Sequence, residues 1–288
     1  MDLDAAKLRL SSNNVLVLDA QDGKAVYAKA ADEVTPIASL TKLMTAMVVL
    51  DANLPMDDVL SIDMDDFDYI KGSHSRLRMG TTLTRAEMLH LALMSSENRA
   101  ASALARHYPG GTLAFVAAMN EKAMALGMTR THYDDSTGLS PRNVSTANDL
   151  AKLVRAAADY PVIRDYSTTP SHFVEVPSGQ TLGFNNSNAL VKNSAWDIQL
   201  QKTGYIREAG RCVVMLVTIA SKPMVIVLLD SIGKFTRVAD AQRVKHWLET
   251  GESMPATAFR TVMKQQAPKS TPNKRIQGKF AATKAPKG

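Results

Sequence analysis

The stretch PIASLTKLMTAMVVLDA, residues 36–52, decides both the fold and the chemistry of this chain. It predicts a helix that begins near Pro36 to Ser39. On a helix, residues i and i+3 share a face, so the Lys42 amine can reach the Ser39 oxygen. A serine hydroxyl needs an adjacent base to become a nucleophile, and lysine is a base only when burial or a nearby cation keeps it neutral. The alternative is a surface pair, since Ser-x-x-Lys arises by chance about once in a chain of this length.

The segments around this stretch predict a hairpin before it and further helices after it. Two apolar runs, residues 14–20 and 25–30, flank Asp22-Gly23, a turn signal typical of a β-hairpin. Thr84 and Glu87 form a capping box that opens a helix over residues 85–94. Further helices are expected over residues 98–108 and 113–126, and over residues 147–160 after a cap at Ser145 or Thr146.

The second half of the chain predicts strands. The runs IQLQKTGYI (198–206), RCVVMLVTIA (211–220) and MVIVLLDS (224–231) are apolar on both faces, which is typical of strands covered on each side. We expect a turn around Lys222-Pro223 and a closing helix over residues 237–250. The predicted fold is α/β (α+β), with a mostly antiparallel central sheet flanked by helices. Residues 1–255 would form the catalytic domain, with a helical insert at roughly 52–195.

Two further short motifs carry candidate site residues. Ser96-x-Asn98 lies in LMSSENRAA, at the predicted break between two helices, where short polar side chains can project into a cleft. A helix cap is the alternative, because Ser, Glu and Asn all suit helix starts. Lys202-Thr203-Gly204 lies on a predicted strand. There the lysine supplies a positive charge, the threonine offers a hydroxyl for a carboxylate, and the glycine permits close approach of a substrate backbone.

The three motifs together match the signature of penicillin-binding proteins and β-lactamases, in the same order and the same structural settings. The chain resembles the low-molecular-mass penicillin-binding proteins, specifically the periplasmic D-alanyl-D-alanine endopeptidases of the penicillin-binding protein 7 type. Besides the motifs, YPGG (108–111) and DSTGLSPRNVSTANDL (135–150) carry the resemblance, which covers roughly residues 12–255. It implies a β-lactamase/transpeptidase-like fold and a periplasmic location.

The resemblance also implies a role for each site residue. Ser39 would be acylated, Lys42 would accept its proton, and Ser96 would assist proton transfer to the leaving group. Asn98 and Lys202 would orient substrate and nucleophile, and Thr203 would bind the carboxyl or carbonyl end of the substrate. The backbone N–H groups of Ser39 and Tyr205 would form the oxyanion hole. Gly204 completes the predicted substrate-binding set, and Arg211 and Arg237 are further candidates for binding a carboxylate.

The implied reaction is hydrolysis of D-Ala–diaminopimelate cross-links between peptidoglycan peptides. Terminal D-Ala–D-Ala is the alternative substrate, as in a carboxypeptidase. A β-lactamase or esterase of the same fold is a third possibility, although the Glu-x-x-Leu-Asn segment that supplies the class A deacylating base is missing. β-Lactams are therefore expected to acylate Ser39 and to leave slowly. The remaining alternative is a non-catalytic wall-binding protein, in which none of the three motifs would have a catalytic role.

The residue composition and motifs give no indication of a metal or cofactor site. The single cysteine, Cys212, lies in an apolar run and is expected to be inert core. The acidic run 63–68 lacks the glycine and closing glutamate of a calcium loop and is expected to be a solvated loop. No zinc motif occurs either, so we expect no metal and no cofactor.

The basic charge of the chain is concentrated at its end. Residues 264–288 carry seven Lys or Arg and no Asp or Glu, whereas the whole chain has a formal net charge of +6. Residues 256–288 are therefore predicted to be a disordered basic tail. Such a tail can contact anionic polymers or simply aid solubility, and we expect no nucleic-acid partner. No signal peptide is visible, and no apolar run reaches the about 18 residues that a membrane anchor needs.

Overall fold

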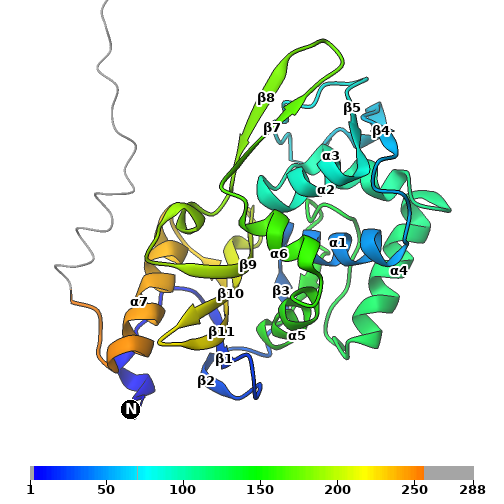
Figure 1. Cartoon of the computed structure of the whole chain (residues 1–288). Coiled ribbons are helices and arrows are strands. Elements are labelled where there is room, and N and C mark those ends of the chain that lie inside the picture. The colour runs from blue at the N-terminus through cyan, green and yellow to red at the C-terminus, as the bar shows by residue number, and fades with distance from the viewer. Residues whose placement is uncertain (1–2, 70, 256–288) are drawn as a thin grey trace, which may run out of the picture. The chain divides into compact units, whose positions relative to one another are not determined.

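The computed structural model describes residues 3–69 and 71–255, and the predicted tail lies outside the described residues. The centre of the fold is an antiparallel sheet with the strand order β2-β1-β11-β10-β9 (Figure 1). Its strands come from both ends of the described chain: β1 (Asn14–Asp19), β2 (Ala25–Lys29), β9 (Asp197–Ile206), β10 (Gly210–Ile219) and β11 (Lys222–Ser231). The predicted hairpin and the predicted antiparallel sheet are confirmed.

The two faces of the sheet pack into two different cores, which explains the continuous apolar runs. Because side chains alternate along a strand, Val213 and Met215 of β10 enter one core while Val214 enters the other. α7 (Thr236–Thr250) covers the first face and α5 (Ala147–Ala157) packs against the second. Cys212 is buried in the sheet, and burial raises the pKa of its thiol to about 12, as expected for inert core.

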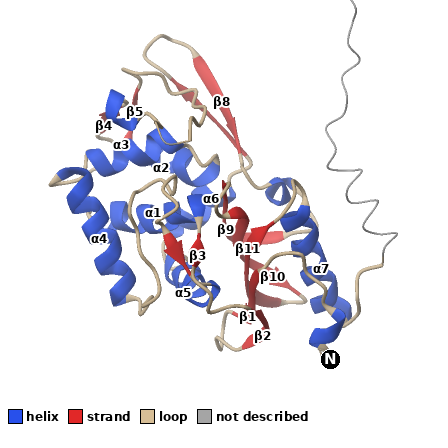
Figure 2. Ribbon diagram, turned by 180° about the vertical axis from the view of Figure 1, so that it is seen from behind, coloured by secondary structure: helices blue, strands red, loops and turns tan. Residues whose placement is uncertain are grey.

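The helical part of the fold lies, in sequence, between β2 and β9 (Figures 1 and 2). Thr84 and Glu87 form the predicted capping box, and Thr146 is the residue that caps α5. The elements between residues 161 and 185, which are one helix and one hairpin, had no counterpart in the sequence-based expectations. The helices besides α5 are α1 (Lys42–Asp51), α2 (Arg85–Met94), α3 (Asn98–Arg106), α4 (Gly111–Ala125) and α6 (Pro161–Thr168).

Short strand pairs fix the loops around these helices. β3 (Thr35–Pro36) pairs with β6 (Val144–Ser145), and β4 (Val59–Ser61) pairs with β5 (Thr82–Thr84). β7 (Ser171–Glu175) and β8 (Thr181–Asn185) form a hairpin that projects from the helical part, beside the segment that leads into β5 (Figure 1). Within residues 3–69 and 71–255, the helices are too short or too polar to cross a membrane.

One local expectation was wrong and another was only partly right. Asp63 and Asp65 of the acidic run are exposed as expected, but Met64–Asp66 forms a 3-10 helix capped by Asp63, and Asp66 is buried in an ion pair with Arg106 (2.8 Å). The turn between β10 and β11 falls at Ala220 and Ser221, which both have positive φ, rather than around Lys222-Pro223. Lys222 and Pro223 already belong to β11, which places the proline at the first residues of a strand, where its missing N–H is tolerated.

Candidate active site

Ser39 lies on a tight turn that precedes the long helix, rather than on the helix itself. Residues Ala38–Thr41 form a 3-10 helix, η2, and α1 begins at Lys42. Lys42 and Ser39 still face each other, because residues three apart eclipse in a 3-10 helix. The distance from Lys42 Nζ to Ser39 Oγ is 2.9 Å. The predicted contact between the two side chains is therefore present in the structure.

Two glycines let other segments approach this turn closely. A Cβ added to Gly204 of β9 would lie 3.0 Å from the Ile37 carbonyl oxygen and 3.1 Å from the Ser39 nitrogen. A Cβ on Gly138 would lie 2.0 Å from the Ala38 carbonyl oxygen, and Gly138 has a φ of +84°. Gly138 therefore excludes a side chain, and a side chain at Gly204 would require the turn that carries Ser39 to shift slightly. Gly204 was expected to make room for substrate, and the structure shows that it also makes room for the turn that carries Ser39.

The Lys42 amine is fully buried and has three oxygen partners. Besides Ser39 Oγ, Nζ contacts Asn98 Oδ1 and the Thr137 carbonyl oxygen, each at 2.7 Å. Burial lowers the pKa of Lys42 to about 7, and the nearby carboxylates of Asp135 and Glu97 limit that fall. A neutral amine has two N–H donors and one lone pair. If the two donors serve Asn98 and Thr137, the lone pair faces the Ser39 hydroxyl.

The second and third motifs meet on the other side of the turn. Ser96 has a positive φ of 63° at the junction of α2 and α3, which turns its side chain out of the helical path. The buried Lys202 donates from Nζ to Ser96 Oγ (2.8 Å) and to the Thr203 carbonyl oxygen (3.0 Å). Burial lowers the pKa of Lys202 well below its ordinary value, and the Lys42 and Arg237 cations lower it further. Residues of all three motifs thus lie together.

Loop 134–143 supplies a part of the site that no predicted residue covered. One carboxylate, that of Asp135, accepts hydrogen bonds from the backbone N–H groups of Thr137 (2.6 Å), Gly138 (2.6 Å) and Ser140 (2.7 Å). This arrangement aims the Thr137 carbonyl at Lys42. The available sequence signal was the Asp-Ser-Thr-Gly string itself, a turn pattern, but a backbone carbonyl leaves no signature in residue types.

Two serines contact the motif residues and were also missed. Asn98 donates from Nδ2 to Ser73 Oγ (2.9 Å), so its amide bridges Lys42 and Ser73. Thr203 donates from Oγ1 to Ser187 Oγ (2.7 Å). Ser73 and Ser187 come from loops that no sequence motif marked. Their hydroxyls fix the orientation of Asn98 and Thr203.

The remaining candidate residues are Arg237, Tyr205 and Arg211, which lie on or beside β9 and β10. Arg237 donates to the carbonyl oxygens of Gly204 and Cys212, both at 3.2 Å, and burial lowers its pKa to about 10. It therefore supports the backbone of β9 and β10. Tyr205 is exposed, and the Arg211 guanidinium lies 4.6 Å from its ring centre. Both arginines are half-buried residues.

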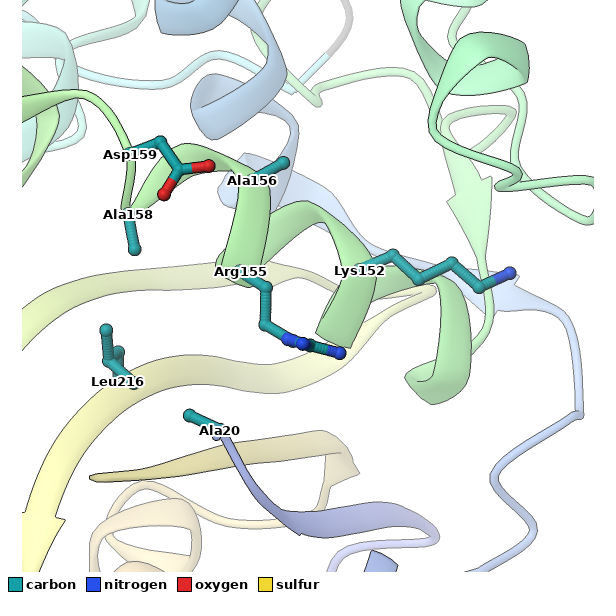
Figure 3. A pocket seen from close by; sticks show the side chains of 7 residues that line it. All are labelled: Ala20, Lys152, Arg155, Ala156, Ala158, Asp159 and Leu216. Atoms are coloured by element: carbon teal, nitrogen blue, oxygen red, sulfur yellow. The ribbon is translucent and has the colours of Figure 1, made fainter. Parts of the chain in front are cut away.

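A separate hollow lies away from these residues, between α5 and the strands. Figure 3 shows Lys152 and Arg155 extending from α5, with Ala20 and Leu216 on the opposite side. None of the predicted site residues lines it. The hollow therefore adds nothing to the arrangement around Ser39.

The sequence of the chain matches a family of known proteins and individual members of it. A family described as D-alanyl-D-alanine carboxypeptidase matches residues 2–233. A Pseudomonas aeruginosa D-alanyl-D-alanine endopeptidase is 52% identical over 252 residues, which cover 86% of this chain and 81% of that protein. An Escherichia coli D-alanyl-D-alanine endopeptidase is 47% identical over 263 residues, covering 91% of this chain and 85% of that protein.

Two solved structures show the same fold at lower identity. A Streptomyces DD-transpeptidase has a TM-score of 0.78 at 28% identity, covering 84% of this chain and 98% of that chain. A penicillin-binding protein from Listeria monocytogenes, in its ampicillin-bound form, has a TM-score of 0.72 at 28% identity, with the same coverage of 84% and 98%. The β-lactamase/transpeptidase-like fold expected from the sequence is confirmed.

Proposed function

Because the chain belongs to the D-alanyl-D-alanine carboxypeptidase family and is thus a serine DD-peptidase, we propose that Ser39 is its nucleophile and Lys42 its base. The observation that carries this assignment is the contact of 2.9 Å between Lys42 Nζ and Ser39 Oγ. It is supported by the burial that lowers the pKa of Lys42 to about 7. At neutral pH a large fraction of the Lys42 side chains is then uncharged and able to accept a proton.

The proposed reaction begins with acylation. Ser39 Oγ attacks the carbonyl carbon of a D-alanyl residue while its proton passes to Lys42 Nζ. The negative charge that develops on the carbonyl oxygen would be stabilised by the backbone N–H groups of Ser39 and Tyr205. Support for this comes from Gly204, because the close approach of β9 to η2 brings the residue before Tyr205 beside the Ser39 nitrogen.

The tetrahedral intermediate then collapses to the acyl-enzyme. The C–N bond breaks, and the leaving amine receives a proton that originates from Lys42 and passes through Ser96. The contact of 2.8 Å between Ser96 Oγ and Lys202 Nζ holds the Ser96 hydroxyl for this transfer. Water then hydrolyses the ester, which releases the D-alanyl product and restores Ser39. Asn98 and Thr203 would hold the amide and the carboxyl or carbonyl end of the substrate, with Lys202 and Gly204 shaping the same wall.

The substrate that we propose is the D-Ala–diaminopimelate cross-link between peptidoglycan peptides, cleaved in the periplasm. Both relatives at 52% and 47% identity are D-alanyl-D-alanine endopeptidases, which supports cleavage of a cross-link. Removal of a terminal D-Ala is the second candidate, because the matching family is described as D-alanyl-D-alanine carboxypeptidase. We further propose that β-lactams acylate Ser39, since the Listeria relative is known in an ampicillin-bound form.

Covalent labelling tests the nucleophile. A fluorescent penicillin is expected to label the wild-type protein, and Ser39→Ala is expected to abolish labelling. Ser95→Ala is a matched control, because Ser95 lies beside the second motif but its hydroxyl donates to the Leu91 carbonyl oxygen (2.8 Å), within its own helix. Undiminished labelling of Ser39→Ala would show that another residue is the nucleophile.

Digestion of purified muropeptides tests the substrate. Mass spectrometry should show cross-linked dimers becoming monomers if the enzyme is an endopeptidase. Loss of a single terminal alanine, with dimers left intact, would identify a carboxypeptidase and rule out the proposed cross-link cleavage. Ser39→Ala provides the inactive control for both products.

A further inference from the structure

A second hollow lies between the segment before β5 and the turn of the hairpin β7–β8. Arg76, Arg78 and Thr81 line it from one side, and Val176, Ser178 and Leu182 line it from the other. Both arginines are exposed, whereas Leu77 between them is fully buried. The two guanidiniums are therefore held at the surface of the hollow by the side chain that anchors the segment between them.

Arg76 is held in a fixed position by an aromatic ring. Its guanidinium carbon lies 4.2 Å from the ring centre of Phe184 on β8, and Phe184 is itself buried. Stacking occupies the flat face of a guanidinium and leaves the N–H groups at its edge free to donate. Among the described residues, no side-chain hydrogen bond or ion pair is made by either Arg76 or Arg78. The hollow thus presents two positive charges whose donors have no side-chain or carbonyl partner within residues 3–69 and 71–255.

Both walls of the hollow continue directly into the Ser39 site. Ser73, three residues before Arg76, accepts the hydrogen bond from Asn98. Ser187, three residues after Phe184, accepts the hydrogen bond from Thr203. The Leu77 carbonyl oxygen also accepts from Arg99, the residue after Asn98 (2.6 Å). Three residues span at most about 10 Å of backbone, so Arg76 lies on a short segment that begins at a residue contacting the Ser39 site.

We propose that Arg76 and Arg78 form a subsite that binds a carboxylate of the acidic peptide cross-linked to the acyl donor. The inference rests on the proposed function, because only a cross-linked substrate carries a second peptide in addition to the one that acylates Ser39. A planar guanidinium matches the two oxygens of a carboxylate. A penicillin has no second peptide, so its reaction with Ser39 does not involve this subsite.

Binding measurements on the full chain test the subsite without depending on turnover. On the Ser39→Ala background, the Kd of a purified cross-linked muropeptide dimer is compared with and without Arg76→Ala and Arg78→Ala. We expect the double substitution to raise the Kd about tenfold, as for the loss of a charge-assisted contact. Arg76→Lys should also weaken binding, because an ammonium group cannot form the bidentate pair. Arg9→Ala, another exposed arginine outside the hollow, is the matched control and should leave the Kd unchanged.

Labelling by penicillin with Ser39 intact separates the subsite from the catalytic centre. The double substitution should leave the rate of labelling unchanged, which also shows that the variant folds. An unchanged Kd, an equal rise in Kd for Arg9→Ala, or a matching loss of labelling would each overturn the subsite. Absence of saturable dimer binding together with normal labelling would also overturn it, while leaving the assignment of Ser39 intact. Failure of labelling in the wild type would instead overturn the proposed function.

Discussion

Lys42 and Lys202 are both fully buried, and each lies within hydrogen-bond distance of a serine hydroxyl, but their charged neighbours differ. Lys42 lies near the carboxylates of Asp135 and Glu97, which favour its charged form and leave its pKa at about 7. Lys202 lies near two cations, Lys42 and Arg237, which add to the effect of burial. At equal burial the neighbouring charges therefore act in opposite directions: carboxylates limit the fall in the pKa of Lys42, whereas cations deepen the fall in the pKa of Lys202.

Of the substitutions that keep Ser39, removing the amine of Lys42 should reduce the rate of penicillin acylation the most. Lys42→Met keeps a long side chain of similar volume but removes the proposed base. We expect the rate of penicillin acylation to fall roughly 10²–10⁴-fold, as for the loss of a general base. The dependence of the remaining rate on pH near neutrality should also disappear. Stopped-flow labelling between pH 5 and about 10 measures both quantities. A variant that keeps the rise with pH would show that Lys42 is not the base.

The same change at Lys202 should reduce the acylation rate less and should leave its dependence on pH in place. Lys202→Met removes the hydrogen bond from Nζ to Ser96 Oγ (2.8 Å) and frees that hydroxyl, so acylation should slow by about 10²–10³-fold. The rise of the rate with pH should persist, because Lys42 is still present. If Lys202→Met abolished that rise and Lys42→Met preserved it, the roles of the two lysines would be exchanged.

The close packing of loop 134–143 against η2 can be tested by a substitution at Gly138. Gly138→Ala would place a Cβ 2.0 Å from the Ala38 carbonyl oxygen, at a φ of +84°. Gly179→Ala is the matched control, because it has a φ of +76° with no atom within 4 Å of the added Cβ. The control should lose about 1–2 kcal/mol of unfolding free energy from backbone strain alone, and Gly138→Ala should lose more than about 3 kcal/mol. Urea unfolding measures both values, and equal losses would show that the contact with η2 is not tight.

The motif residues and the main elements of the fold were predictable from sequence for a physical reason. Continuous apolar runs, a capping box and an Asp-Gly turn are local signals, and they correctly located the hairpin β1–β2, the strands β9 to β11 and the start of α2. The three motifs consist of reactive side chains whose residue types are themselves informative. The structure then brings Ser39, Lys42, Ser96, Asn98 and Lys202 together, as the sequence predicted, and their catalytic roles stay predictions.

The missing parts of the site depend on geometry that residue types do not encode. Thr137 contributes a carbonyl oxygen, and Gly138 contributes the absence of a side chain. Ser73 and Ser187 act through hydroxyls on loops whose positions depend on tertiary packing. The acidic run was partly misjudged for a similar reason, because the burial of Asp66 depends on Arg106, a partner 40 residues away. Contacts between residues so far apart in the sequence cannot be predicted from local sequence patterns.

The smallest expected effect is at Glu97, whose carboxylate favours the charged form of Lys42. Glu97→Gln keeps a side-chain oxygen that can accept the hydrogen bond from the Arg99 nitrogen, as Glu97 Oε1 does at 3.2 Å. Removing the negative charge should lower the pKa of Lys42, so the rise of the acylation rate should move to lower pH. Measurement of the midpoint against the wild type checks the direction. A midpoint that moves to higher pH would contradict the account of the charges around Lys42.

The most direct test of the central claim is the pH dependence of acylation in the wild-type enzyme. Because Lys42 accepts the Ser39 proton only when it is neutral, the second-order rate of penicillin acylation should rise with pH and level off above the Lys42 pKa of about 7. The account predicts a midpoint near that value, which is lost in Lys42→Met. A rate that is flat from pH 5 to about 10, or a midpoint near the ordinary lysine pKa of about 10.4, would show that a neutral Lys42 does not activate Ser39.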